Sequence, residues 1–208
     1  MKTLSDFNFK VQVALIRVDF NVPMNEAQQV TDTNRITAAK PTIDAVLAQG
    51  GKAVLMSHFG RPKGQVNPSM SLSLIVEAVS EVLGVPVAFS EDCVGDKAQA
   101  AIAALAPGGV LLLENLRFHS EEEAGDEAFA KQLASLGDIY VNDAFGTAHR
   151  AHASTTIIAQ YFKGACCFGA LLAKEILAID KVMSSGEKPV TAILGGSKVS
   201  SKITIIEN

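Results

Sequence analysis

Cysteines are few and long apolar runs are missing, and these absences exclude several classes of protein. Cys93, Cys166 and Cys167 cannot all pair, and adjacent cysteines are poor partners for one another, so we expect no disulfide scaffold. The N-terminal segment MKTLSDFNFK has no signal-peptide core, and no stretch approaches the roughly 20 apolar residues of a membrane helix. We therefore expect a soluble cytoplasmic protein without a membrane partner.

Basic residues are also scarce, with 18 lysines and arginines against 22 aspartates and glutamates and a formal net charge of −4. An acidic chain without a basic run lacks the surface that binds a nucleic-acid backbone, so no nucleic-acid partner is expected. The 208 residues are 48% hydrophobic and have a mean hydropathy of +0.24, which excludes a disordered polymer. At roughly 150 residues per domain, the length predicts one to two domains.

Short apolar runs alternate with helical patterns along the chain. The runs are near-continuous, as in parallel strands that are covered on both faces, and lie at 11–20, 52–58, 85–89, 110–118, 138–145 and 189–194. The helical patterns lie at 33–49, 71–84, 96–106, 126–136 and 151–185. This alternation predicts an α/β, doubly wound, Rossmann-like parallel sheet with helices on both faces and ligands at the carboxyl ends of its strands.

Some local features refine this picture. Pro41 lies inside the first helical pattern and predicts a kink or the start of a second segment. The acidic triplet 121–123 is interpreted as a solvated helix approach, and Cys166 and Cys167 as core thiols. Residues 171–183 have the pattern of a long surface or interdomain helix.

Two common nucleotide-binding fingerprints are absent. No G-x-G-x-x-G follows the first apolar run, and no G-x-x-x-x-G-K-[S/T] occurs. The remaining glycine signal is Gly195 and Gly196, followed by Lys198 and Lys202 on one face of a helix start. This turn could hold nucleotide phosphates, but from spacing alone a glycine turn with two solvated lysines is the simpler interpretation.

Polar side chains follow the predicted strands. They are Asp19 and Asn21, His58 and Arg61, Arg117, and Arg150, while Arg35 stands at a helix start. A guanidinium suits phosphate because it donates two parallel hydrogen bonds and keeps its charge, and a helix start also favours anions. We therefore predict a site for a small, strongly anionic ligand. Asp19 and Asn21 suit a hydroxyl group on that ligand.

Each candidate also has a simpler interpretation. A single arginine is more often a surface ion pair, but four in equivalent topological positions favour ligand contacts. Arg17 lies inside the first apolar run, so we expect a buried structural pair outside the site. His58 could instead satisfy a turn carbonyl, and His149 and His152 favour loop hydrogen bonds. No two histidines have metal-ligand spacing with a cysteine or carboxylate, so no protein-held metal is expected.

Taken together, six segments resemble the phosphoglycerate kinase family, in order along nearly the whole chain. They are RVDFNVP (17–23), NRI (34–36), SHFGRP (57–62), LLENLRF (112–118), NDAFGTAHRAH (142–152) and GGSKVSSKI (195–203). The resemblance implies a glycolytic enzyme that reversibly transfers a phosphoryl group from 1,3-bisphosphoglycerate to ADP, giving 3-phosphoglycerate and ATP. The alternative is a non-catalytic module that binds a phosphorylated metabolite. Arg35 and Lys198 separate the two, since only a transfer reaction needs them to face each other.

The resemblance also implies a role for each candidate. Asp19 and Asn21 would hold the hydroxyl and carboxyl end of the glycerate, and His58, Arg61, Arg117 and Arg150 the non-transferring phosphate. Arg35 and Lys198 would be catalytic, on opposite sides of the phosphoryl group in flight. Lys202, with Gly195 and Gly196, would contact the nucleotide, which is supplied as Mg-ATP or Mg-ADP.

The family is bilobal and about twice as long as this chain. We expect a phosphoglycerate-binding domain at 1–168, an interdomain helix or hinge at 169–186, and the beginning of a nucleotide domain at 187–208. The chain alone is then expected to be inactive. The run 189–194 would have no sheet of its own to join. We expect it to be disordered, to pair with the edge of the first domain, or to be exchanged between chains, so that the chain could self-associate although the family is monomeric.

Overall fold

The structure is a computed structural model that describes residues 1–185, 191 and 193. The chain divides into two compact units, Met1–Glu175 and Ile176–Asn208. The division falls inside the segment 169–186 for which an interdomain helix was predicted. The assignment of three functional parts to the chain stays a prediction.

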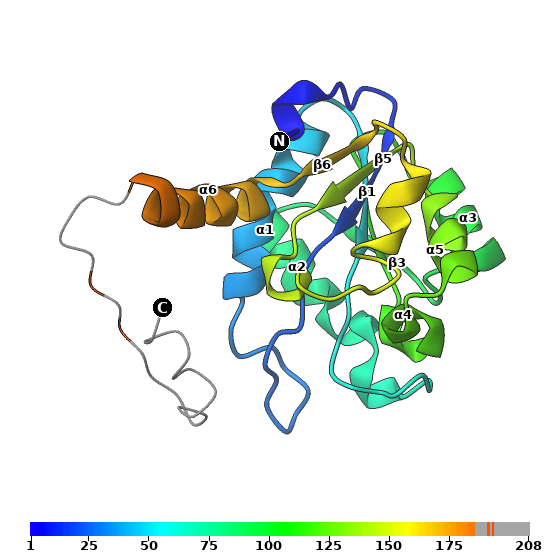
Figure 1. Cartoon of the computed structure of the whole chain (residues 1–208). Helices are drawn as coiled ribbons and strands as arrows, with labels where there is room; N and C mark the ends of the chain where they lie inside the picture. The colour runs from blue at the N-terminus through cyan, green and yellow to red at the C-terminus, as the bar shows by residue number, and fades with distance from the viewer. Residues whose placement is uncertain (186–190, 192, 194–208) are drawn as a thin grey trace. The chain divides into compact units, whose positions relative to one another are not determined.

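The first unit contains one parallel sheet (Figure 1). Its strands are β1 (Val13–Arg17), β2 (Lys52–Met56), β3 (Val87–Ser90), β4 (Val110–Leu113), β5 (Ile139–Asn142) and β6 (Cys166–Phe168). Their order is β3-β4-β2-β1-β5-β6, and every neighbouring pair is parallel. The predicted α/β parallel sheet is therefore confirmed.

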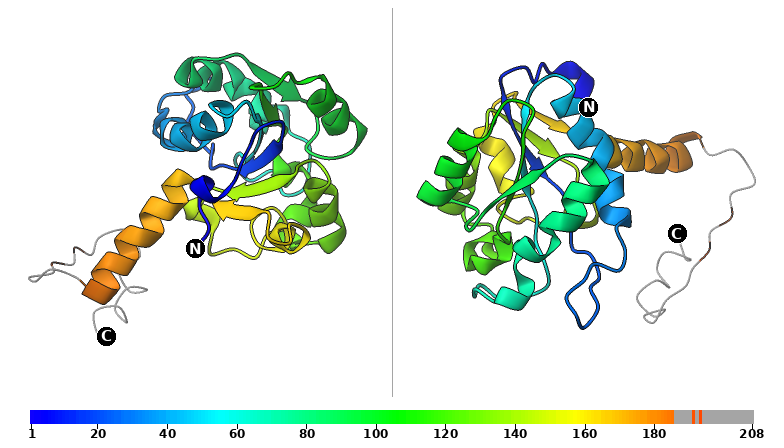
Figure 2. Two further views of the ribbon diagram at one scale, coloured as in Figure 1. Left: turned by 90° about the horizontal axis from the view of Figure 1, so that it is seen from above. Right: turned by 180° about the vertical axis from the view of Figure 1, so that it is seen from behind.

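Helices cover both faces of this sheet (Figures 1 and 2). They are α1 (Asn34–Leu47), α2 (Val76–Leu83), α3 (Gly95–Ala104), α4 (Ser120–Ala124) and α5 (Glu127–Ala134). Helix α6 (Ala170–Ser185) follows β6 in the chain. Successive β1 side chains point to opposite faces, so Ile16 packs with α1 and α2 while Leu15 packs with α3 and α5. These two apolar layers explain why the strand sequences are almost continuously hydrophobic.

Local signals set several helix boundaries. The Asp126 carboxylate accepts a hydrogen bond from Phe129 N at 2.7 Å and caps α5, and Gly84 ends α2 in the left-handed conformation. Helix α1 runs without interruption through Pro41, so the expected second start does not occur. Among the described helices, none has both the length and the hydropathy needed to cross a bilayer.

The segment 151–185 differs most from its helical prediction. It contains a short 3-10 helix (Ile157–Tyr161) and then the edge strand β6 before α6 begins. Three residues are too short to show a period, and pairing of Cys166 with Tyr140 on β5 decides their conformation. Cys167 is buried as expected, whereas Cys166 is half-buried. The run 189–194 lies outside the described residues apart from 191 and 193.

The observed strands are shorter than the predicted runs, chiefly at their carboxyl ends. Strand β1 ends at Arg17 and β4 at Leu113, so the polar residues that follow them lie in loops. Parallel strands place these loops at one edge of the sheet, where ligands bind in this class of fold.

Candidate functional site

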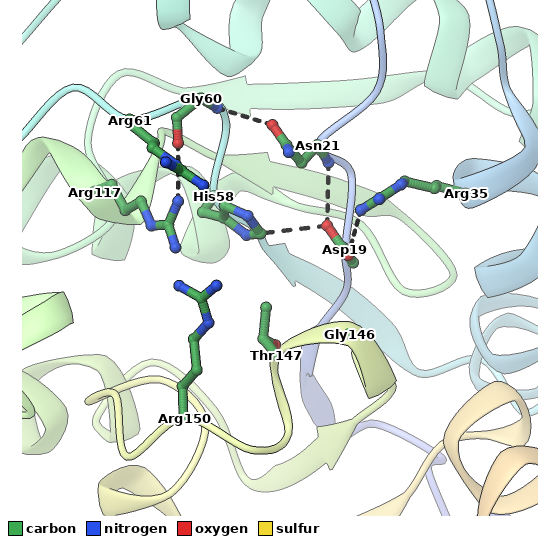
Figure 3. A pocket seen from close by; sticks show the side chains of 10 residues that line it. All are labelled: Asp19, Asn21, Arg35, His58, Gly60, Arg61, Arg117, Gly146, Thr147 and Arg150. Atoms are coloured by element: carbon green, nitrogen blue, oxygen red, sulfur yellow. Dashed lines mark hydrogen bonds and ion pairs between the residues drawn. The ribbon is translucent and has the colours of Figure 1, made fainter. Parts of the chain in front are cut away.

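The loops that follow β1, β2, β4 and β5 enclose a pocket of about 270 Å³ (Figure 3). Its lining residues are Asp19, Asn21, Arg35, His58, Gly60, Arg61, Arg117, Gly146, Thr147 and Arg150. Every candidate predicted between residues 19 and 150 is among them. The pocket straddles β1, where the chain reverses its direction of travel across the sheet, which is the switch point at which such sheets bind ligands.

One wall of the pocket combines acceptor and donor groups. Arg35, at the start of α1, forms an ion pair with the Asp19 carboxylate that follows β1. Asn21 Oδ1 accepts a hydrogen bond from Gly60 N at 2.9 Å, which leaves the Asn21 amide nitrogen as a donor toward the pocket. This wall can therefore bind a group, such as a hydroxyl, that both donates and accepts.

A second wall is held by the buried amide of Asn115. Its Oδ1 accepts from Phe59 N and Arg117 N, both at 3.1 Å, and its Nδ2 donates to Phe59 O at 2.7 Å. The side chain of Asn115 thus ties the loop after β2 to the loop after β4. Arg117 Nη1 donates to Gly60 O at 2.9 Å, and Gly60 has a φ of +61°, which glycine adopts without strain.

Arg117 is only 5% exposed and lies with Nε 3.2 Å from Glu123 Oε1. Burial lowers the pKa of its guanidinium. The ordinary pKa of arginine lies so far above neutrality that the group stays charged. Arg117 therefore contributes a fixed positive charge to the floor of the pocket.

Arg61 and Arg150 complete the basic surface. Thr155 Oγ1 and Thr156 Oγ1 donate to Arg150 O at 2.7 and 3.2 Å and hold the backbone of its loop. The Arg150 guanidinium points toward Arg117 (Figure 3). Within the described part of the chain, no hydrogen bond or ion pair engages the side chain of either Arg61 or Arg150. Their donors are therefore available to a ligand.

His58 is the neutral member of the pocket. Burial and the charges of Arg17, Arg117, Arg35 and Arg150 together lower the pKa of its imidazole to about 2. At neutral pH the lining therefore carries four arginine charges and one carboxylate. The excess of positive charge in a small pocket favours a compact anion with more than one negative charge.

Sequence reasoning did not single out every lining residue. Gly60, Gly146 and Thr147 also line the pocket. They lie between predicted residues in the same strand-end loops. Their closeness in sequence to the predicted residues could have identified them. Gly195, Gly196, Lys198 and Lys202 lie outside the described residues, so their predicted nucleotide and catalytic roles stay predictions.

The structure corrects three predictions about residues beside the site. Glu122 is fully buried, although a solvated triplet was expected, because its carboxylate accepts two hydrogen bonds from Ser154. His149 is exposed, and no hydrogen bond joins its side chain to another described residue. His152 lies with Nδ1 3.9 Å from Glu122 Oε1, and its side chain makes no hydrogen bond to the loop among the described residues.

Arg17 is fully buried as expected, but no described carboxylate lies within ion-pair distance of it. Arg17 Nη2 lies 3.2 Å from Nδ1 of His58 and thus directly behind the pocket lining. The prediction that placed Arg17 apart from the site therefore missed this contact.

One group of possible metal ligands occurs in the described part of the chain, formed by Asp92, Cys93 and His119. His119 Nε2 and Asp92 Oδ1 already share a hydrogen bond of 2.9 Å, and burial raises the pKa of the Cys93 thiol. None of the three lines the arginine pocket. The expectation of no protein-held metal stays a prediction.

The fold and the pocket together define an α/β domain of the class that binds ligands at the carboxyl edge of a parallel sheet, here with an excess of arginine charge in the lining. The family model described as phosphoglycerate kinase matches residues 4–208. The chain therefore belongs to the phosphoglycerate kinase family.

Individual relatives agree with this assignment. The chain is 52% identical over 207 residues to phosphoglycerate kinase of Chlorobium phaeovibrioides and 53% identical over 206 residues to that of Moorella thermoacetica, covering 100% and 99% of this chain. The match spans 52% of each relative, so the chain has about half their length.

Solved structures give the same result. Phosphoglycerate kinase from Pyrococcus horikoshii aligns with a TM-score of 0.89 at 34% identity, over 100% of this chain and 52% of that one. Phosphoglycerate kinase from Coxiella burnetii aligns with a TM-score of 0.86 at 37% identity, over 99% of this chain and 51% of that one.

Proposed function

We propose that this chain provides the phosphoglycerate-binding part of an enzyme that transfers a phosphoryl group reversibly between 1,3-bisphosphoglycerate and ADP. The observation that carries the proposal is the pocket in which four arginines face one carboxylate and one neutral imidazole. Family membership supports the choice of ligand, because the relatives are named phosphoglycerate kinase.

The proposed ligand is 3-phosphoglycerate or its acyl phosphate, and its groups match the lining. Asp19 and Asn21 would bind the hydroxyl and carboxyl end. His58, Arg61, Arg117 and Arg150 would bind the phosphate that is not transferred. This division is supported by the mixed donor and acceptor character of the first pair and by the unengaged guanidinium groups of Arg61 and Arg150.

The chemistry needs position and charge more than covalent participation. A phosphoryl group in flight spreads negative charge over its oxygens, and an arginine placed against it stabilises that charge by several kcal/mol. Arg35 is the candidate, since it lines the pocket beside the position proposed for the carboxyl end. Its ion pair with Asp19 holds the guanidinium at the pocket edge before the ligand arrives.

The nucleotide side of the reaction remains a prediction from the sequence. Lys198 would contact the transferred group from the opposite side, and Lys202, Gly195 and Gly196 would contact Mg-ATP or Mg-ADP. We also expect that the 208-residue chain alone does not turn over substrate, and steady product formation from 3-phosphoglycerate and MgATP would contradict this. Self-association through the run 189–194 is a separate expectation, tested by size-exclusion chromatography with light scattering.

The decisive experiment is a calorimetric titration of 3-phosphoglycerate into the 208-residue chain at low salt, with sulfate titrated in parallel. We expect saturable binding that is tighter than that of sulfate. Arg150→Ala removes charge-assisted hydrogen bonds and should weaken binding by about 1.5–3 kcal/mol. Lys163→Ala is the matched control, because Lys163 is exposed and lies before β6, away from the carboxyl edge.

Two results would count against the proposal. Binding of 3-phosphoglycerate no tighter than that of sulfate would show that the pocket does not recognise the glycerate. Equal losses of affinity in Arg150→Ala and Lys163→Ala would show that anion binding depends on the net charge of the chain and not on the pocket. A non-catalytic binding module would also bind 3-phosphoglycerate, but Arg35 would then have no role in phosphoryl transfer.

A further inference from the structure

A chain of buried polar groups lies behind His58 and outside the pocket lining. Arg17 Nη2 is 3.2 Å from His58 Nδ1, and Arg17 Nε donates to Ser154 Oγ at 2.9 Å. Ser154 Oγ in turn donates to Glu122 Oε1 at 2.6 Å. Arg17, Ser154 and Glu122 are each 0% exposed. We call these three residues the buried relay.

The relay balances its own charge. No described carboxylate contacts the positively charged Arg17 directly, and Glu122 carries the compensating negative charge one hydroxyl away. Ser154 N also donates to Glu122 Oε2 at 3.0 Å, so both oxygens of the carboxylate are hydrogen-bonded. A buried charge is tolerated only when it is paired and hydrogen-bonded, which the serine bridge achieves here.

The surrounding elements hold the bridge in place. Tyr140 Oη, on β5, donates to Ser154 O at 2.8 Å, and Ala153 N donates to Glu122 O at 3.0 Å. Arg17 Nη1 donates to the neighbouring Val18 O. Hydrogen bonds therefore hold both Nε and Nη1 of Arg17, and they fix the position of Nη2 behind the imidazole.

The contact with His58 has only one chemical form. A guanidinium can donate hydrogen bonds but cannot accept them, so Nδ1 of His58 must be the acceptor. An imidazole that accepts at Nδ1 is neutral and carries its proton on Nε2. Within the described residues, no hydrogen bond engages Nε2, and the ring lines the pocket. The Nε2–H group is therefore free to donate to a ligand.

We propose that Arg17, anchored to Glu122 through Ser154, is a positioning residue that fixes His58 as a neutral Nε2–H donor toward the anion. The assignment of Nε2–H stands by itself, and its use in binding phosphoglycerate rests on the proposed function. A neutral donor among four arginines adds a directed hydrogen bond without adding to their mutual repulsion.

Other charged groups also face His58 and could set its state. Asp19 Oδ1 lies 4.0 Å from Nδ1 and would favour a proton there. Arg35, Arg117 and Arg150 oppose protonation from α1, from the loop after β4 and from the loop after β5. Arg17 sets the choice between the two nitrogens, because no other described residue donates a hydrogen bond to either of them.

The first experiment measures the tautomer directly in the 208-residue chain. Long-range ¹H–¹⁵N correlation spectra, assigned with His58→Gln, should show His58 neutral with its proton on Nε2 from about pH 5 to pH 8. A His58 signal that titrates in this range, or one that carries the proton on Nδ1, would overturn the proposal. This result does not depend on whether 3-phosphoglycerate binds.

The second experiment removes the relay without leaving a lone buried charge. The double variant Arg17→Met with Glu122→Gln replaces both ions by neutral groups of similar volume, a change that folded proteins tolerate far better than loss of one partner. Glu121→Gln is the matched control, since Glu121 is the exposed neighbour of Glu122. Thermal unfolding of both variants establishes that they are folded.

In the double variant, Nδ1 is free to take a proton facing Asp19. We expect the His58 signal to move toward the Nδ1–H form or to titrate, and 3-phosphoglycerate and sulfate to bind roughly tenfold more weakly at about pH 8, as expected for the loss of a hydrogen bond to a charged group. Sulfate keeps its charge over this range, and its affinity should recover toward about pH 5 as the imidazole becomes cationic.

If Arg17 had only a structural role, the double variant would give a different result. If the folded double variant kept the Nε2–H form and a flat pH profile for sulfate, Arg17 would not set the tautomer and the proposal would fail. If the wild-type tautomer is Nε2–H but 3-phosphoglycerate does not bind, the proposed function fails and the assignment of the relay stands.

Discussion

The buried charged side chains of the sheet domain and those on the rim of the pocket differ in how far the protein itself uses their hydrogen-bonding groups. Arg17, Glu122 and Asp143, which we call the buried layer, are each 0% exposed and hydrogen-bonded to protein groups, although Asp143 Oδ2 has no partner among the described residues. Arg35 and Arg61 are exposed at the rim. The buried layer is fixed by the fold, whereas the rim keeps donors for a ligand. Substitutions in the first should cost stability, and substitutions in the second should cost binding.

Asp143 marks a second contrast, within the buried layer itself. Arg17 has an opposite charge one hydroxyl away, but no described cation pairs with Asp143. Its Oδ1 accepts from Leu172 N at 3.1 Å at the start of α6, and a Cβ at Gly169 would lie 2.2 Å from that oxygen. Glycine is therefore required beside it. Burial, opposed by these hydrogen bonds, raises the pKa of the Asp143 carboxyl to about 6.

The largest expected effect is on the buried layer. Glu122→Ala leaves Arg17 as an uncompensated buried charge and should lower the free energy of unfolding by about 3–5 kcal/mol. Urea denaturation measures it. Glu121→Ala, at the exposed neighbouring position, should change stability by no more than about 0.5 kcal/mol. Equal effects at the two positions would show that the relay contributes nothing to the fold.

The next largest effect is a pH dependence of the folding stability that arises from Asp143. Its folded pKa of about 6 lies above the ordinary value of 3.8, so the folded state holds the proton more tightly. The stabilisation is complete below about pH 4 and is lost as the pH rises through about 6. Relative to Asp143→Asn, the wild-type protein should lose about 2–3 kcal/mol between these limits.

Urea denaturation of both proteins at about pH 4 and pH 7.5 tests this prediction. A difference between wild type and Asp143→Asn that stays constant with pH would contradict it. Asp96→Asn, at an exposed aspartate, is the control and should change stability by less than about 0.5 kcal/mol.

Rim arginines should show the reverse pattern. Arg61→Ala should weaken 3-phosphoglycerate binding by about 1.5–3 kcal/mol in calorimetry, because the Arg61 guanidinium has no hydrogen-bond or ion-pair partner among the described residues and its removal costs only bonds to the ligand. Its unfolding midpoint should stay the same or rise, since one of four like charges is removed. A clear loss of stability would place Arg61 with the buried layer instead.

The smallest expected effect is that of the exposed ion pair. The Arg35 side chain is 49% exposed and that of Asp19 is 18% exposed. Such a pair contributes little, so Arg35→Ala should change the free energy of unfolding by less than about 1 kcal/mol. Differential scanning calorimetry at low and high salt measures this, and a larger loss would show that the pair holds the start of α1.

Much of the sheet could be predicted because burial on both faces leaves a direct trace in the sequence. β2 and β5 lie within the apolar runs found there, and their carboxyl ends carry the predicted polar residues. The strand β6 could not be predicted, since three residues at a sheet edge show no period and depend on pairing with β5. Helix α1 likewise passes through Pro41 because its packing on the sheet outweighs the local preference.

The sequence by itself determined the alternating α/β order and the set of polar residues beyond the strand ends. Both follow from local rules: apolar runs of strand length, and the shared edge at which parallel strands end. Only the tertiary structure decided that Glu122 is buried, that Ser154 joins it to Arg17, and that Arg17 stands behind His58. These contacts join residues 32 to 137 positions apart, and no local pattern encodes which distant partner a buried charge will meet.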